Sequence, residues 1–199
     1  MVKEKHKTRE TELNKPDIEL IKGYLGGAGN DFEELYDRYK KMLYGYLNNM
    51  LPQQQSTVDD IFQQTWLKVI EKLPEYKCSN RFSAWLFRIA HNLTIDHFRR
   101  SKKFNNQVEL DSEDAPELPD KDNLVWENMD RSDFERAMGQ VLETLQEEQR
   151  EVFMLRLDKI SFKEIAEIQN CSINTVLARM QYAMKNLKKS LIAWKTKDQ

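Results

Sequence analysis

Residues 161–189, SFKEIAEIQNCSINTVLARMQYAMKNLKK, contain two short helical patterns around a tight turn. Ser161 and Glu164 have the spacing of a capping box, in which each side chain satisfies a free backbone amide at the start of a helix. Asn170 tolerates the left-handed backbone that a sharp turn between helices needs. Ser172 is among the residues preferred at the start of the following helix. Together these features predict a helix-turn-helix.

The second helix of this pair is expected to have an apolar back and a basic front. At 100° per residue, one side carries Ile173, Val176, Met180, Ala183, Met184 and Leu187. The other side carries Thr175, Ala178, Arg179, Tyr182, Lys185, Asn186 and Lys189. No acidic residue occurs between residues 172 and 197. Such a helix suits the major groove of DNA, although an ordinary helical hairpin with a solvated face fits the same pattern.

Composition favours an all-α protein with more than one part. The chain has 199 residues, with only 6 Gly and 5 Pro and 32% charged residues. Its net charge is only −2, but the acids are concentrated between residues 104 and 135, so the rest of the chain is basic. We expect a disordered tail over 1–16, a helical domain over 17–103, a flexible acidic linker over 104–130, and a second helical domain over 131–195 that carries the helix-turn-helix.

Cysteine usage and hydropathy indicate a reduced, cytoplasmic protein without a metal site. Cys78 and Cys171 are far apart, and neither has a second Cys or a His at the spacing of metal ligands. No apolar run approaches the length of a membrane span, and the first 15 residues lack the apolar core of a signal peptide. We therefore predict no cofactor, no metal and no membrane insertion.

Four helices are expected in the first domain. The first starts after Pro16, and the second runs roughly from Asn30 to Leu51, where Pro52 ends it. The third is predicted to be capped by Ser56 or Thr57, with an apolar stripe of Ile61, Phe62, Thr65, Trp66, Val69, Ile70 and Leu73. The fourth runs from Phe82 to about Lys103, and its outer side groups Arg88, His91, Asn92, Ile95, Arg99 and Lys102. Charges of one sign grouped in this way are typical of a nucleic-acid contact.

No catalytic motif appears in the sequence. G-x-S-x-G, H-E-x-x-H and a phosphate-cradling glycine loop are all absent. Binding proteins therefore remain: a transcription initiation factor, a free-standing helix-turn-helix regulator, or an adaptor that binds only protein. An adaptor does not need two basic helical faces, and a nucleic-acid enzyme would need a cluster of metal-binding carboxylates.

Three motifs resemble those of bacterial sigma-70-type factors. Residues 59–66, DDIFQQTW, are similar to the core-binding signature of that family. Residues 82–92, FSAWLFRIAHN, followed by Ile95-Asp96 and Arg99-Arg100, resemble its promoter-melting helix. Residues 148–153, EQREVF, together with 161–189, resemble the domain that reads the −35 element. Their order and spacing match the small extracytoplasmic-function (ECF) group, and the resemblance covers roughly residues 17–191.

The resemblance implies specific roles, which are expectations at this stage. Core polymerase is expected to bind Asp59, Asp60, Gln63 and Gln64, where Gln64 replaces an acid that is usual in the family. The −10 element is expected to contact Ser79, Asn80, Arg81, Arg88, Asn92, Asp96, Arg99, Arg100 and Lys103. The −35 element is expected to contact Ser172, Thr175, Leu177, Ala178, Arg179, Tyr182, Lys185 and Lys189.

The second helix of the predicted helix-turn-helix differs from the family at two positions that are expected to contact the −35 element. Leu177 stands where Lys or Arg is usual, and Tyr182 replaces another common Arg. We therefore expect weaker attraction to phosphates and more apolar or shape-dependent reading of an A/T-rich element. The partners implied are core RNA polymerase, through its clamp coiled coil and flap, promoter DNA, and an anti-sigma factor. The free-standing helix-turn-helix regulator is the alternative, but it would leave Asp60, Gln63 and residues 82–100 without a role.

Overall fold

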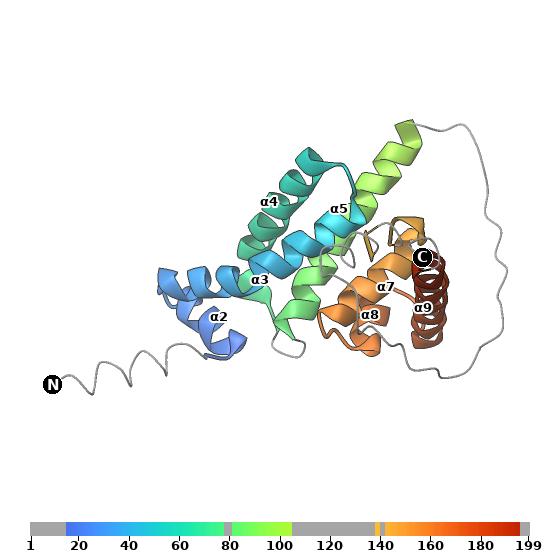
Figure 1. Cartoon of the computed structure of the whole chain (residues 1–199). Coiled ribbons are helices and arrows are strands. Elements are labelled where there is room, and N and C mark those ends of the chain that lie inside the picture. Colours follow the sequence, from blue (N-terminus) through green and yellow to red (C-terminus); the bar gives the residue numbers. More distant parts are fainter. Residues whose placement is uncertain (1–14, 78–80, 105–137, 140–141, 196–199) are drawn as a thin grey trace.

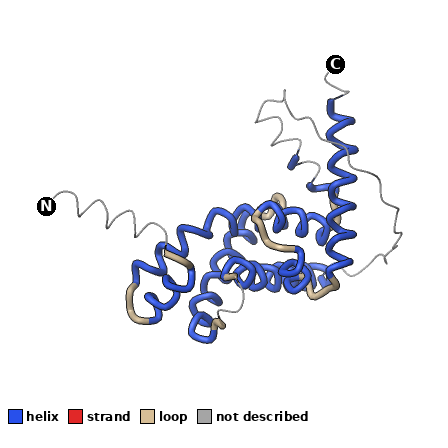
Figure 2. Tube along the Cα trace, turned by 90° about the horizontal axis from the view of Figure 1, so that it is seen from below, coloured by secondary structure: helices blue, strands red, loops and turns tan. Residues whose placement is uncertain are grey.

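The computed structural model describes residues 15–77, 81–104, 138–139 and 142–195, with backbone only for 102–104 and 190–195. Within these ranges all regular structure is helical (Figure 1), as predicted. The tube view in Figure 2 shows helices joined by short loops, without a strand in the described part. The predicted tail, the predicted linker and residues 131–137 of the second predicted domain lie outside the described residues, except for Lys15, Pro16 and the backbone of Phe104.

The first group of helices comprises α2 (Asp17–Leu25), α3 (Gly29–Met50), α4 (Gln55–Lys72), the 3-10 turn η1 (Leu73–Glu75) and α5 (Phe82–Phe104). The long helix α3 contacts α2, α4 and α5, and α4 also contacts α5. Leu35, Leu43 and Leu47 of α3 are fully buried, because apolar residues recur on one side of that helix. Burial of this side places α3 at the centre of the group.

The start of α4 differs from the prediction. No side chain caps the helix, whose first residue is Gln55 and whose capping position is Gln54. Gln53 has a φ of 62° and therefore takes the left-handed turn just before this point. The Val58 amide then donates to the Gln54 carbonyl, 3.0 Å away. The prediction of a cap at Ser56 or Thr57 was wrong because the turn after Pro52 closes earlier than the side-chain preferences suggest.

The second group comprises α7 (Glu147–Leu157), α8 (Phe162–Ile168) and α9 (Ile173–Lys195). Helix α9 packs on both α7 and α8. A small core beneath it contains Leu142, Leu145, Phe153, Ala183 and Leu187. This packing fixes the orientation of α9 and so decides which of its side chains face outward.

The two groups pack directly against each other, which the sequence did not predict. Helix α7 contacts α3, and α8 contacts α5 (Figure 1). The main apolar core is continuous across this contact, with Leu43 and Leu86 on one side and Leu155 and Ile165 on the other. We call this arrangement closed, meaning α7 packed on α3 and α8 packed on α5.

Candidate functional site

The outer side of α4 holds the predicted polymerase contacts. Asp60, Gln63 and Gln64 are exposed there, and we call these three residues the polymerase face. Asp59 is also exposed, but its carboxylate accepts hydrogen bonds from Tyr44 at 2.7 Å and from Gln55 at 3.4 Å. Asp59 is therefore attached to α3, whereas the polymerase face is available to a partner.

Leu67 extends the polymerase face by one turn. It is 66% exposed, the largest value among the exposed large apolar side chains. Its spacing from Asp60, Gln63 and Gln64 places it on the same side of the helix. The sequence analysis missed Leu67, and this helical spacing is the signal that indicates it. Ile70, which was assigned to the buried stripe, is 39% exposed, so that assignment was wrong.

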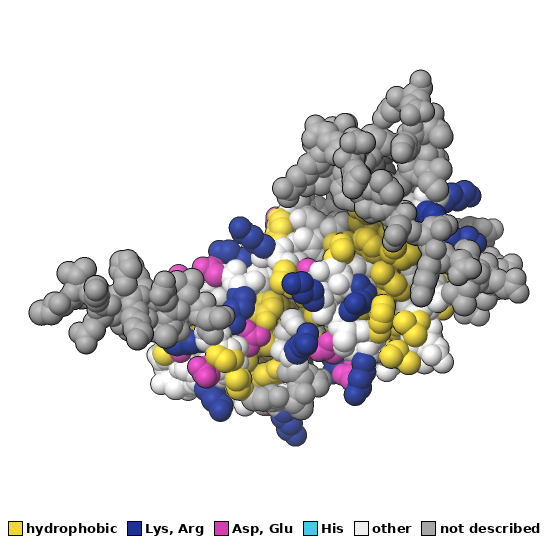
Figure 3. All heavy atoms as spheres, turned by 60° about the horizontal axis from the view of Figure 1, so that its bottom comes forward, with side chains coloured by type: hydrophobic (Ala, Val, Ile, Leu, Met, Phe, Trp, Pro, Cys, Tyr) yellow, Lys and Arg dark blue, Asp and Glu magenta, His cyan; other side chains and the backbone are white. Residues whose placement is uncertain are grey.

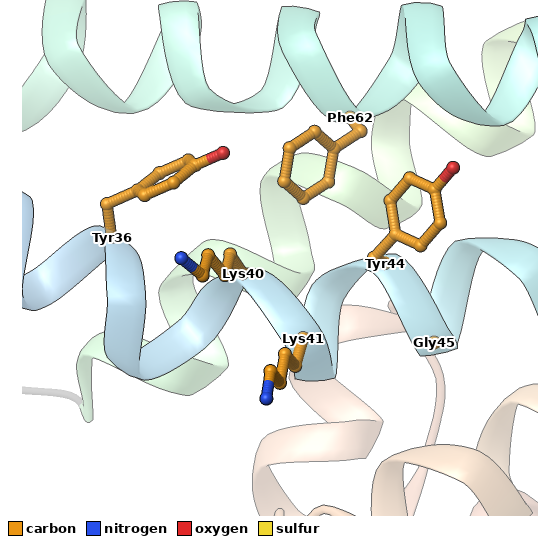
Figure 4. Close-up of a pocket in the computed structure, with 6 residues that line it drawn as sticks. All are labelled: Tyr36, Lys40, Lys41, Tyr44, Gly45 and Phe62. Carbon is orange, nitrogen blue, oxygen red and sulfur yellow. The ribbon is translucent and has the colours of Figure 1, made fainter.

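A shallow hollow lies between α3 and α4 (Figure 4). It is lined by Tyr36, Lys40, Lys41, Tyr44, Gly45 and Phe62. Phe62 projects from α4 toward α3, and its ring lies edge-on to Tyr44, with 5.4 Å between centroids. The hydrogen bond to Asp59 raises the pKa of Tyr44. The hollow offers aromatic surface with the amines of Lys40 and Lys41 among its lining groups.

The predicted −10 contacts gather on the outer side of α5. Asn92, Asp96 and Arg99 are exposed and share one face at spacings of four and three. Arg100, next to Arg99, and Arg81, just before the start of α5, are also exposed. Ser79 and Asn80 lie outside the described residues, and for Lys103 only the backbone is described.

Arg88 is a predicted −10 contact whose partner lies in the second group of helices. Its guanidinium lies 3.0 Å from the Glu167 carboxylate on α8. The two side chains are 38% and 40% exposed, so water screens the pair strongly. In the closed arrangement, Arg88 is thus tied to the second group of helices.

The inner side of helix α5 is packed into the core. Leu86, Phe87 and Ala90 are fully buried. Trp85 is half-buried and packs on Tyr76, with ring centroids 4.8 Å apart, so it acts as a core residue here. The outer side chains of α5 are consequently displayed from a rigid helix.

The predicted helix-turn-helix is confirmed in its local details. Ser161 and Glu164 form both hydrogen bonds of the capping box at the start of α8. Asn170 adopts a left-handed backbone with a φ of 50°. The Ser172 hydroxyl accepts from the Thr175 amide at 3.1 Å, which caps the start of α9. The turn is therefore built by the residues that predicted it.

The faces of α9 are rotated relative to the prediction. Val176, Ala183 and Leu187 are buried as expected, but Ile173 and Met184 are 47% and 38% exposed. Packing on two helices covers a narrower strip than the full apolar set, so the assignment of Ile173 and Met184 to the core was wrong. Among the predicted −35 contacts, six are exposed: Ser172, Thr175, Leu177, Ala178, Lys185 and Lys189.

Two predicted −35 contacts are instead half-buried, Arg179 and Tyr182. The Arg179 guanidinium donates to the Gln169 side chain at 2.8 Å and so braces the turn. Asn174 and Gln181 are exposed on the outer side of α9, and the sequence analysis missed them. The spacing of Asn174, Ala178, Gln181 and Lys185 places these residues in one row.

Positive charge is distributed rather than concentrated on the surface seen in Figure 3. Lys and Arg side chains there are separated by acidic and apolar patches. A face of this kind attracts nucleic acid through individual cations on particular helices rather than through one broad basic field. A contact with DNA is therefore assigned helix by helix, to α5 and to α9.

Two further features bear on the class of protein. Among the described residues, His, Cys, Asp and Glu do not form a group that could hold a metal ion. Within the same ranges, each helix is too short or too polar to cross a membrane.

Comparison with known proteins identifies the family. Residues 35–104 match the Sigma-70 region 2 family model, and residues 135–187 match the Sigma-70 region 4 model. The ECF RNA polymerase sigma factor SigW of Bacillus subtilis is 28% identical over 178 residues, which cover 86% of this chain and 94% of SigW. The ECF RNA polymerase sigma-E factor of Haemophilus influenzae is 25% identical, covering 82% of this chain and 89% of that protein.

A solved structure shares the fold. The sigma factor RpoE of Bartonella quintana, crystallised with the anti-sigma factor NepR, aligns with a TM-score of 0.61 and 22% identity, covering 81% of this chain and 96% of RpoE. The two family models match the halves that carry the α5 face and the helix-turn-helix, in the same order. The chain therefore belongs to the sigma-70 family of RNA polymerase sigma factors, in its extracytoplasmic-function group.

Proposed function

We propose that this chain is a dissociable subunit that binds core RNA polymerase, recognises −10 and −35 promoter elements, and promotes DNA melting. The observation that carries this proposal is the presence of three separate exposed surfaces in the order of the family. These are the polymerase face on α4, the charged face of α5, and the outer row of α9. In this function the polymerase makes the bonds, and the chain itself has no catalytic step.

Melting is assigned to α5 and the residues just before it. Separating and trapping a base from the duplex costs a few kcal/mol, so an opened strand needs side chains that hold it. Arg99 and Arg100 neutralise phosphates, and Asn92 and Asp96 offer hydrogen bonds to base edges. Ser79, Asn80, Arg81, Arg88 and Lys103 complete the proposed −10 surface.

Reading of the −35 duplex is assigned to α9. Leu177 and Ala178 present apolar surface that suits thymine methyl groups in the major groove. Thr175, Asn174 and Gln181 supply neutral hydrogen-bonding groups, while Lys185 and Lys189 contact phosphates further along the helix. Arg179 acts chiefly through the turn, because its guanidinium is bound to Gln169.

Polymerase binding is assigned to Asp59, Asp60, Gln63 and Gln64, with Leu67 added from its exposure. The proposed docking sites on the polymerase are its clamp coiled coil and its flap. We place residues 17–103 in the clamp-binding and −10 domain, and residues 131–195 in the −35 domain. The acidic segment between them is proposed to run through the RNA path of the polymerase, and the location of the chain is proposed to be cytoplasmic.

An anti-sigma factor is the further partner proposed. The support is the likeness to RpoE, which was crystallised with its anti-sigma factor NepR. A protein that covers α4 or α5 would prevent polymerase or promoter binding.

The first experiment is gel filtration of the full chain with bacterial core RNA polymerase. The wild-type chain should co-elute with the enzyme, and the Asp60→Ala, Gln63→Ala variant should not. Glu19→Ala with Lys22→Ala changes two exposed residues of α2 and serves as the matched control, which should still co-elute. If the wild-type chain fails to co-elute, the free-standing helix-turn-helix regulator becomes the better assignment.

A further inference from the structure

The exposed side chains on the first half of α9 are all neutral. From the helix cap onward they are Ser172, Ile173, Asn174, Thr175, Leu177, Ala178, Gln181 and Met184. Between residues 172 and 184 the sequence contains one cation, Arg179, and no acid. A helix of this kind in a major groove has to distinguish bases by neutral hydrogen bonds and apolar contacts.

The one cation, Arg179, is held by the turn of the helix-turn-helix. Its Nη1 donates to Gln169 Oε1 at 2.8 Å and lies 3.5 Å from the sulfur of Cys171. Gln169 is held in turn, because its Nε2 donates to the Glu148 carbonyl at 3.1 Å. Guanine is most often read by an arginine or lysine that donates two hydrogen bonds to its O6 and N7. Arg179 is bound away from that role.

Two exposed amides, Asn174 and Gln181, lie on the outer side of the same half. Their side chains make no hydrogen bond within the part of the chain that the structure describes. An Asn or Gln amide matches the major-groove edge of adenine, because its oxygen accepts from the N6 amine while its nitrogen donates to N7. The first half of α9 therefore offers two groups that fit adenine and no free group that fits guanine.

The spacing of the two amides limits which base pairs they reach. Seven residues of α-helix bring side chains back to within about 20° of each other and advance them by about 10.5 Å. Base pairs are stacked about 3.4 Å apart, so Asn174 and Gln181 reach pairs about two or three steps apart. Ala178 lies between them in the same row, and Leu177 lies beside that row. Both present apolar surface to the bases in between.

We propose that Asn174 and Gln181 each read an adenine of the −35 element, while Leu177 and Ala178 pack on thymine methyl groups between them. The element then contains two A·T pairs two or three steps apart, and guanine is disfavoured at both positions. This inference rests on the proposed function, which places α9 in the major groove of the −35 duplex. Lys185, one turn beyond Gln181, contacts a phosphate and adds affinity without base preference.

The chemistry of the two amides gives the size of the expected preference. Guanine carries the O6 acceptor where adenine carries the N6 donor, so the amide oxygen of Asn174 or Gln181 loses its partner. Replacing either adenine by guanine should therefore weaken binding by about tenfold. The two losses should multiply, because the side chains lie about two helical turns apart.

The first test is selection of bound sequences from duplex DNA randomised around −35, with the full chain bound to core polymerase. The wild-type chain should enrich two A·T pairs two or three steps apart. Asn174→Ala should lose the preference at one pair and Gln181→Leu at the other. Lys185→Ala is the matched control in the same row: it should keep both preferences, bind all sequences more weakly, and lower the salt slope by about 1. A guanine enriched at either position, or wild-type preferences in Gln181→Leu, would overturn the proposal.

A base analogue tests the same contacts in the wild-type chain, so the result does not depend on the folding of a variant. 7-Deazaadenine keeps the Watson–Crick face of adenine but lacks N7. Placed at each selected adenine in turn, it should weaken binding by about fivefold, and Gln181→Leu should be unaffected at the position that Gln181 reads. Equal binding of normal and substituted duplexes by the wild type would contradict adenine reading. Enrichment of no sequence at all around −35 would instead contradict the proposed function itself, and the inference with it.

Discussion

The two helices assigned to promoter DNA, α5 and α9, differ in what they expose. Helix α5 presents charged groups, with Arg99 and Arg100 beside Asp96. Helix α9 presents Leu177 and Gln181 in its first half. The cation between these two residues, Arg179, is bound to Gln169. Cations suit the phosphates of a separated strand, whereas apolar and amide groups suit base edges in an intact major groove. The difference in exposed chemistry supports the proposal that α5 holds a separated strand and α9 reads a duplex.

The largest effect is expected from reversing the charge on α5. Arg99→Glu with Arg100→Glu replaces phosphate attraction by repulsion, so open-complex formation should fall by about 100-fold or more. The measurement is abortive transcription from a two-element promoter with saturating core enzyme. Lys41→Glu reverses another exposed cation, on α3, and should leave activity within a factor of two or so.

A change on α9 should act on duplex reading alone. Leu177→Ala removes an apolar contact in the groove and should weaken −35 binding by about tenfold, without changing the salt dependence of binding. Binding to duplex −35 fragments at several salt concentrations measures both quantities. Leu157→Ala truncates another exposed leucine, at the end of α7, and serves as the control. A changed salt slope for Leu177→Ala would show that the apolar assignment is wrong.

The cap of α9 provides a smaller, structural test. Ser172→Ala removes the hydroxyl that accepts from the Thr175 amide and should lower stability by about 1 kcal/mol. The −35 duplex should bind less tightly, while melting of a preopened −10 bubble template should be unaffected, because α5 does not depend on this cap. Thermal unfolding and the two DNA assays report these effects. Equal losses in both assays would contradict the assignment of α9 to the −35 duplex and of α5 to the melted −10 strand.

The smallest expected effect is a pH dependence of the stability of the second group of helices, to which α9 belongs. Burial raises the pKa of Asp158, at the end of α7, to about 6 from a usual value of 3.8. The charged form is therefore disfavoured in the folded chain, and stability is lost as pH rises from about 4 through 6. Asp158→Asn should raise the melting temperature at pH 7.5, by an amount corresponding to less than about 1 kcal/mol after screening. At pH 4.5 the variant and the wild type should differ less.

Local sequence signals predicted much of the fold. The capping box at Ser161, the left-handed Asn170 and the cap at Ser172 are all confirmed, because each depends on residues within a few positions. The spans of α3 and α5 agree with the apolar periodicity within one or two residues. Sequence motifs also identified the family, which the region 2 and region 4 matches confirm.

The burial and partners of several residues depend on tertiary packing and could not be predicted from the local sequence. Glu151 looks like a solvated acid near the start of a helix, yet it is buried because α7 meets α3 and α5. Arg179 has the spacing of a groove contact, but the adjacent turn supplies Gln169 as its partner. Ile173 and Met184 match an apolar stripe but fall beyond the strip that α7 and α8 cover. The assigned roles of the site residues remain predictions that the experiments above test.

The most direct measurement is permanganate footprinting of a two-element promoter with core polymerase and the full chain. Thymines near −10 should become reactive only when the chain is present, and they should lose reactivity with the Arg99→Glu, Arg100→Glu variant. With Leu177→Ala, reactivity should return to the wild-type level when the protein concentration is raised, because that change affects binding rather than opening. Reactive thymines in the absence of the chain, or none in its presence, would contradict the account.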